Sequence, residues 1–175
     1  MSGVLEVRAL TRDGFEAFGD VIESEGRESF FINDGMAERF HALSRVDVGG
    51  EGASAGISLV RSRKFELPHR VDHVEYHPLG SQAFLPLDDT PFVVVVAAAG
   101  VAPEPADLRA FITDGRQGIN YHRGTWHHVL LTPFAAMDFI CIDRLGGGDN
   151  CVDHVFAPGM RLELAIDAHG GFSPG

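Results

Sequence analysis

Short apolar segments recur along this chain from position 57 to position 143, at a spacing of roughly ten residues, with Gly, Pro or Asp between them. These segments cover residues 57–61, 71–77, 82–87, 92–99, 108–113, 119–122, 126–132 and 137–143. Many short strands with turn residues between them are typical of antiparallel sandwiches and barrels. Segment 92–99 is apolar on both faces, so we expect it in the centre of a sheet. The predicted fold class is therefore mainly all-β, an antiparallel β-barrel or jelly roll with a few short helices.

The part of the chain before position 56 is less regular. Residues 4–10 alternate weakly and predict a strand, and Thr11 is suited to cap a short helix that Gly19 would end. Residues 24–55 are rich in Gly, Ser and charged side chains, and within them only residues 40–46 suggest a strand. We expect this long connection either to close over a pocket or to contact a partner.

Chain length limits the number of domains. A chain of 175 residues can bury one full core and is short for two. We expect one domain over residues 1–160. The last residues, 161–175, are rich in Gly and are expected to form a flexible tail.

Charge and composition exclude several kinds of partner. The 14 basic and 25 acidic residues give a formal net charge of −11, whereas binding to nucleic acid or to an anionic membrane needs a concentrated basic face. No segment approaches the ~20 apolar residues that span a bilayer, and the N-terminus lacks the features of a signal peptide, so we expect a cytoplasmic protein. Cys141 lies in an apolar run and is predicted to be a buried free thiol. Cys151 is interpreted as structural.

Two polar motifs adjoin the predicted strands. The first is Glu75-x-His77 followed after four residues by Gln82, and the second is Gly124-x-x-His127. Their spacing parallels the two halves of the cupin metal motif, His-x-His-x4-Glu and Pro-x-Gly-x-x-His, with two ligand types changed. We therefore expect a cupin-like pocket, with Glu75, His77, Gln82 and His127 as candidate metal ligands.

Other histidines near these motifs need separate treatment. His69, His73 and His77 lie four residues apart, but flanking prolines and β-branched neighbours favour a strand over a helix. At ~3.3 Å per residue, His69 and His77 would be ~26 Å apart on a strand, too far to share an ion. We interpret His69 and His73 as surface residues at strand ends. Because adjacent strand residues point to opposite faces, His127 and His128 should not both face the pocket.

Several segments closely resemble the ureidoglycolate lyase family, a family with a cupin-like fold. The resemblance covers roughly residues 5–156 and is most specific over residues 75–87, 91–97 and 110–131. It extends to the pairs Asp138-Phe139, Asp143-Arg144 and Asn150-Cys151. The chain has Val129 where the family often has Pro. The resemblance implies a cupin-like barrel, a homodimer, and cleavage of (S)-ureidoglycolate to glyoxylate and urea in allantoin degradation. A divalent metal, nickel or manganese, is a candidate cofactor.

This reaction needs a base for the substrate hydroxyl group, an acid for the departing nitrogen and an anchor for the carboxylate. The candidate catalytic residues are His77 or His127 as the base and Tyr121 or His128 as the acid. The candidate substrate-binding residues are Gln82 and Asn120 for the urea group, and Arg63, Lys64 or Arg123 for the carboxylate. For each of the three cations, a solvated surface position is the simpler interpretation.

Three other functions compete with this reading. The first is hydrolysis of the ureido group by an amidohydrolase, which would release ammonia instead of urea. The second is a non-catalytic cupin that binds a small anionic ligand. The third is a metal-dependent cupin dioxygenase, which Glu75 and Gln82 disfavour because they replace the expected His and Glu.

Overall fold

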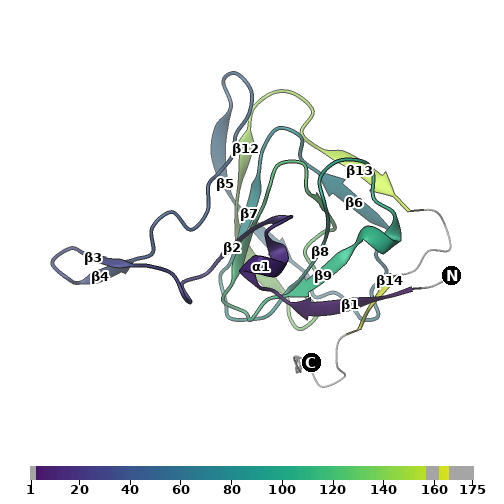
Figure 1. Cartoon of the computed structure of the whole chain (residues 1–175), viewed down its shortest axis with the longest axis horizontal. Coiled ribbons are helices and arrows are strands. Elements are labelled where there is room, and N and C mark those ends of the chain that lie inside the picture. Colours follow the sequence, from purple (N-terminus) through teal and green to yellow (C-terminus); the bar gives the residue numbers. More distant parts are fainter. Residues whose placement is uncertain (1–2, 157–161, 166–175) are drawn as a thin grey trace.

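The apolar segments after position 53 build two β-sheets that pack against each other (Figure 1). The structure is a computed structural model, and it describes residues 3–156 and 162–165. The larger sheet has seven strands in the order β13 (Val152–Val155), β6 (His73–Tyr76), β11 (Trp126–His127), β8 (Val93–Ala97), β9 (Arg109–Ile112), β1 (Gly3–Ala9) and β14 (Leu162–Ala165). The smaller sheet has five strands in the order β2 (Gly19–Ile22), β10 (Gly118–Tyr121), β7 (Gln82–Pro86), β12 (Met137–Leu145) and β5 (Ser54–Ser62).

Antiparallel pairing dominates both sheets, and only β1 is parallel to its neighbours β9 and β14. Two short helices, α1 (Arg12–Phe15) and η1 (Pro105–Asp107), complete the domain. This arrangement confirms the prediction of a mainly all-β, cupin-like fold. Within the described residues, no helix has the length and apolar character needed to cross a membrane.

Strand β8 lies inside the larger sheet, between β11 and β9, as its apolar sequence predicts. Val94 and Val96 face the core between the two sheets, where they pack near Phe139. Val93 and Val95 face a second core on the other side of the sheet. All four valines are fully buried, and burial of one such side chain is worth about 1.5–3 kcal/mol.

The N-terminal helix is shorter than expected. Thr11 does cap it, because its Oγ1 accepts a hydrogen bond of 3.1 Å from the backbone N–H of Gly14. The helix ends at Phe15, however, and Gly19 begins β2 instead of ending the helix.

The strand predicted over residues 40–46 is wrong. Those residues, all of which the structure describes, contain no strand, and a hairpin of β3 (Phe30–Ile32) and β4 (Ala37–Arg39) precedes them. Asn33, Asp34 and Gly35 all have positive φ, which Asn, Asp and Gly adopt more readily than other residues. Figure 1 shows this hairpin standing away from the two sheets.

The C-terminal part differs from expectation in two places. The strand predicted over residues 126–132 is only two residues long, and β13 was not predicted. Residues 162–165 of the expected tail form β14 and pair with β1. The rest of that tail, residues 161 and 166–175, lies outside the described residues.

Candidate active site

A cavity of about 390 Å³ opens between the two sheets. One part of its lining is apolar and includes Val60, Phe65, Phe84 and Leu130. The polar lining residues come from both sheets and include Glu75, Gln82, Tyr121, His127, His128 and Asp143. Among the described residues, no Lys or Arg lines the cavity. The described lining therefore contains the carboxylates of Glu75 and Asp143 without a Lys or Arg side chain to neutralise them.

Strands β6 and β11 bring Glu75 and His127 together, because these residues are directly opposite in the antiparallel pair. His77 follows β6 and lies two residues after Glu75, which places it on the same side. Oε1 of Glu75 is 3.6 Å from Nε2 of His127 and 3.8 Å from Nε2 of His77. The three potential ligand atoms all lie within 4.8 Å of one another.

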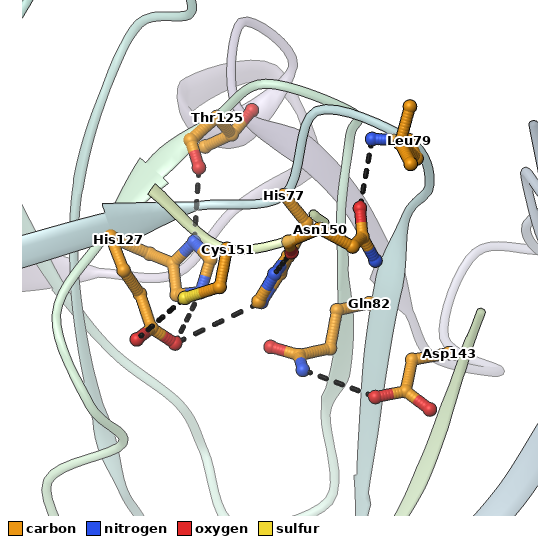
Figure 2. Close-up of polar contacts among 9 residues, drawn as sticks. His77, Leu79, Gln82, Thr125, His127, Asp143, Asn150 and Cys151 are labelled. Atoms are coloured by element: carbon orange, nitrogen blue, oxygen red, sulfur yellow. Dashed lines mark hydrogen bonds and ion pairs between the residues drawn. The ribbon is translucent and has the colours of Figure 1, made fainter. Parts of the chain in front are cut away.

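Backbone carbonyls fix the orientation of both imidazoles (Figure 2). Nδ1–H of His127 donates to the carbonyl of Thr125 at 2.9 Å, and Nδ1–H of His77 donates to the carbonyl of Asn150 at 2.6 Å. In the neutral imidazoles, Nε2 then carries the lone pair that faces Glu75. Within the described part of the chain, both Nε2 atoms are buried without a hydrogen-bond partner.

These features fit a divalent metal ion. Metal-ligating histidines usually donate their other N–H to a carbonyl or a carboxylate. Nitrogen and oxygen ligands lie ~2.0–2.2 Å from such an ion, so ligand atoms roughly 3–4 Å apart can share it. A positive ion would also relieve the contact between two imidazole lone pairs and an ionised carboxylate. Glu75, His77 and His127 are therefore the residues that could hold a metal.

The charge states in this group differ. When Nε2 of His127 carries a proton, its hydrogen bond to the carboxylate is the largest cause that lowers the pKa of Glu75 to about 2, and burial acts in the opposite direction. Glu75 is ionised at neutral pH. Burial, followed by the negative charge of Glu75, raises the pKa of Tyr121, which therefore stays protonated. The Tyr121 ring stacks on His127 with 4.3 Å between ring centroids. Its buried hydroxyl group has no hydrogen-bond partner among the described residues.

Three polar residues form a row on the inner face of the smaller sheet. Tyr121 of β10 pairs in register with Gln82 of β7, and Asp143 of β12 follows next across the sheet, beside Gln82. The amide nitrogen of Gln82 donates to Oδ2 of Asp143 at 3.3 Å. Figure 2 shows the Gln82 amide oxygen turned away from Asp143.

His128 also lines the cavity, so the prediction that only one of His127 and His128 could face it is wrong. Strand β11 ends at His127, and the alternation of faces therefore ends there too. Nδ1–H of His128 donates to the carbonyl of His73 at 2.8 Å, and its Nε2 is 3.0 Å from Nε2 of His69. Burial lowers the pKa of His128 to about 4, which keeps it neutral at pH 7.

The pair with His128 also corrects the interpretation of His69 as a free surface residue at a strand end. Strand β6 begins only at His73, so His69 lies before the strand and is half-buried against His128. Burial lowers the pKa of His69 as well.

Comparisons with known proteins indicate the same family as the sequence motifs. The family model described as ureidoglycolate lyase matches residues 2–163. The chain belongs to the ureidoglycolate lyase family. It is 48% identical to the ureidoglycolate lyase of Pseudomonas paraeruginosa over 160 residues, which cover 91% of this chain and 95% of that protein. It is equally similar, at 48%, to the ureidoglycolate lyases of Pseudomonas syringae pv. tomato, covering 91% and 94%, and of Pseudomonas fluorescens, covering 92% and 96% of the respective chains.

Within this family fold, five of the residues singled out from the sequence line one cavity, and a sixth, His77, lies beside it. The five are Glu75, Gln82, Tyr121, His127 and His128. The exposed side chains of Arg63 and Lys64 do not reach the lining that the structure describes.

The side chains of Asn120 and Arg123 form hydrogen bonds with the segment before β5 instead of lining the cavity. Tyr121 takes the cavity face of β10, so Asn120 points to the opposite face, where its amide nitrogen donates to Oγ of Ser44 at 2.8 Å. Nε of Arg123 donates to a carboxylate oxygen of Asp47 at 2.8 Å. The alternation of faces along β10 explains this separation of Asn120 from Tyr121.

Sequence reasoning missed two contributors to the site. Asp143 has the same face of β12 as Phe139 and Cys141, and period two from those residues could have identified it. Asn150 is the other, because its carbonyl holds His77 while its side-chain oxygen accepts from the backbone N–H of Leu79 at 2.8 Å (Figure 2). A distance of more than 70 residues along the chain hides this contact from a local pattern.

The two cysteines are both free. Cys141 is buried, as predicted, and burial raises the pKa of its thiol to about 12. Cys151 is exposed as a residue, with Sγ 3.6 Å from Oε2 of Glu75; partial desolvation of the thiol, followed by the negative charge of Glu75, raises its pKa to about 11. Both thiols are therefore protonated at neutral pH.

Proposed function

We propose that this chain is a ureidoglycolate lyase, which cleaves (S)-ureidoglycolate to glyoxylate and urea. The observation that carries the proposal is the convergence on the Glu75 carboxylate of two buried imidazole nitrogens that have no hydrogen-bond partner among residues 3–156, at the wall of a cavity of small-molecule size. The opposite wall carries phenol, amide and carboxylate groups suited to a ureido group.

The reaction consumes no water. The substrate has a hydroxyl group and a ureido nitrogen on the same carbon. Loss of the hydroxyl proton and protonation of that nitrogen break the carbon–nitrogen bond and leave an aldehyde. The site must therefore bind a carboxylate, accept one proton and donate another, and each proton transfer is typically worth ~10²–10⁴-fold in rate.

Glu75, His77 and His127 would hold a divalent ion such as nickel or manganese, with the Gln82 amide oxygen as a further oxygen donor. Bound there, the ion would supply positive charge for the carboxylate and hydroxyl oxygens of the substrate. Such a charge is needed because, among the described residues, no Lys or Arg lines the cavity.

Tyr121 is the proton donor to the departing nitrogen. Its raised pKa keeps the proton on the hydroxyl group until the nitrogen becomes basic during bond cleavage. His128 is less suited, because both of its ring nitrogens already have hydrogen-bond partners. The hydroxyl proton has its acceptors on the other wall, where the Glu75 carboxylate and Nε2 of His77 and His127 are the candidate bases; an ion bound there would leave this role to the acceptor atom that does not hold it.

The test is to incubate the purified protein with freshly prepared racemic ureidoglycolate and to measure glyoxylate, urea and ammonia, with and without a chelator. A lyase gives urea equal to glyoxylate and leaves one enantiomer, half of the racemate, untouched. Two ammonia molecules per glyoxylate would assign the chain to the hydrolases. Loss of activity with a chelator and recovery with nickel or manganese would support the metal, whereas full activity in chelator would support a histidine base.

The homodimer and the cytoplasmic location belong to the same proposal. Strand β5 is an edge of the smaller sheet and exposes Ile57 and Leu59 on its outer face, with 76% and 58% of these residues accessible. Exposed apolar groups on an edge strand favour pairing with another chain. Light scattering on the purified protein would give twice the mass of the chain.

A further inference from the structure

We infer that Asp143 binds the terminal amino group of the ureido substrate, next to Gln82 at the ureido carbonyl, and so determines which substrates the site accepts. The inference rests on the proposed function and adds a residue to it. Asp143 lies on the inner face of β12 and lines the cavity opposite the Glu75 wall.

The Asp143 carboxylate is open to a ligand. Within the described residues, the Gln82 amide nitrogen donates to it at 3.3 Å, the neighbouring Cys141 thiol is a second hydrogen-bonding group, and no Lys or Arg forms an ion pair with it. The next residue, Arg144, turns away and donates to the carbonyl of Gly49 at 2.6 Å. An ionised carboxylate has about four acceptor positions, so Gln82 and Cys141 together leave positions on Asp143 for a ligand.

Asp138 provides a contrast on the same strand. It lies five residues earlier, on the opposite face, where two nitrogens of Arg61 donate to it at 2.8 Å and 2.9 Å. Asp138 is therefore neutralised by Arg61 at the surface, whereas Asp143 faces a cavity whose described lining contains no Lys or Arg.

The row of Tyr121, Gln82 and Asp143 matches the order of groups in a ureido substituent. A ureido group presents first the nitrogen that must be protonated, then a carbonyl acceptor, and last an NH₂ group with two donors. The row presents a phenol O–H, an amide with a second N–H beyond the one given to Asp143, and an acceptor-only carboxylate. Each substrate group therefore meets its complement on successive strands, which lie ~4.8 Å apart.

An acyl group without the NH₂ would lack this match. Where an acetyl group replaces the carbamoyl group, a methyl group faces Asp143, and the carboxylate loses water without gaining a donor. Sites built to bind an N–H or O–H group reject analogues that lack it by large factors, up to 10⁴–10⁵. Because Asp143 is only partly buried, we expect a smaller preference, of about 10²-fold.

The experiment compares ureidoglycolate with N-acetyl-2-hydroxyglycine, in which a methyl group replaces the terminal NH₂. The same elimination would give glyoxylate and acetamide. The unaltered protein should prefer ureidoglycolate by about 10²-fold in kcat/KM. Asp143→Ala should reduce this ratio to less than about fivefold, mainly by loss of activity on ureidoglycolate. Asp138→Ala, a matched control on the same strand, should leave the ratio unchanged.

Binding of non-cleavable analogues separates this inference from the proposed function. Oxalurate, which has a carbonyl in place of the carbinol, and N-acetyloxamate differ by the same NH₂-to-methyl change. Calorimetry should show about tenfold tighter binding of oxalurate, and Asp143→Ala should abolish the difference. Equal affinities in the unaltered protein, or an unchanged ratio in the variant, would overturn the inference, even if neither carbinol is cleaved. If Asp143→Ala does not fold, Asp143→Asn keeps the side-chain size and should give a ratio at least threefold lower than that of the unaltered protein.

Discussion

Two pairs of histidines contact the cavity region, and they use their ring nitrogens in opposite ways. His77 and His127 each give Nδ1–H to a backbone carbonyl and keep a buried Nε2 that faces Glu75 and has no hydrogen-bond partner in the described part of the chain. His69 and His128 instead place their Nε2 atoms 3.0 Å from each other, and His128 gives Nδ1–H to a carbonyl as well. The first pair has capacity for a ligand, whereas the Nε2 atoms of the second pair bind each other.

The difference shows that residue type and proximity are poor guides to the role of a histidine. His127 and His128 are neighbours in sequence, both are almost fully buried, and both line the cavity. They differ in the group that lies next to Nε2, which is the Glu75 carboxylate for His127 and the His69 imidazole for His128. We therefore assign ligand binding to the first pair and packing and hydrogen bonding to the second.

The sharpest test of this assignment is the substitution His127→Gln. It removes one of the three ligand atoms around Glu75, so kcat/KM should fall by ~10³-fold or more. Metal retained after dialysis, measured by mass spectrometry, should fall to background. His41→Ala, which removes an exposed histidine from the connection formed by residues 24–55, is the control and should change neither value. A His127→Gln protein that keeps both metal and turnover would contradict the assignment.

Tyr121→Phe should have the next largest effect on turnover. It removes the proposed proton donor, and kcat should fall by ~10²-fold while KM changes little. The hydroxyl group is buried without a partner among the described residues, so its loss should leave the urea midpoint of unfolding unchanged or higher. A lower midpoint together with unchanged kcat would instead assign the hydroxyl group to stability.

Much of this architecture could be predicted from the sequence, because it depends on local patterns. Turn residues and apolar runs marked most of the strands, and the two polar motifs marked Glu75, His77 and His127, whose side chains the structure brings together. The features that were missed depend on distant contacts or on the end of a pattern. Asn150 reaches His77 from another strand connection, and His128 faces the cavity only because β11 ends one residue earlier. Neither fact has a signal in a window of ten residues.

The lowered pKa of His128, which belongs to the pair of His69 and His128, predicts how the free energy of unfolding depends on pH. An unfolded histidine has a pKa of about 6.5, whereas burial lowers that of His128 to about 4, so between these values the unfolded chain binds a proton that the folded chain does not. Stability should therefore fall as the pH decreases from about 6.5 to 4, by up to about 3 kcal/mol.

Glu75 acts in a lower range. Its pKa of about 2 is below the unfolded value, so its stabilising contribution is present above about pH 4.5 and is lost as the pH falls toward 2. Urea unfolding in chelator at pH 7, 5.5 and 4.5 thus isolates the histidines. His128→Gln should flatten this dependence, and an unchanged slope would show that His128 is not the titrating group.

The smallest expected effect concerns the positive charge that binds the substrate carboxylate. If the ligand group of Glu75, His77 and His127 anchors the substrate carboxylate through an ion, the exposed Arg63 and Lys64 have no part in binding it. The double variant Arg63→Ala, Lys64→Ala should then change KM by less than about threefold, since isolated surface charges contribute little. Raising the salt concentration should have a similarly small effect. A rise in KM of more than tenfold would restore the carboxylate clamp that the sequence suggested, and would require the segment carrying these two residues to close over the cavity when substrate binds.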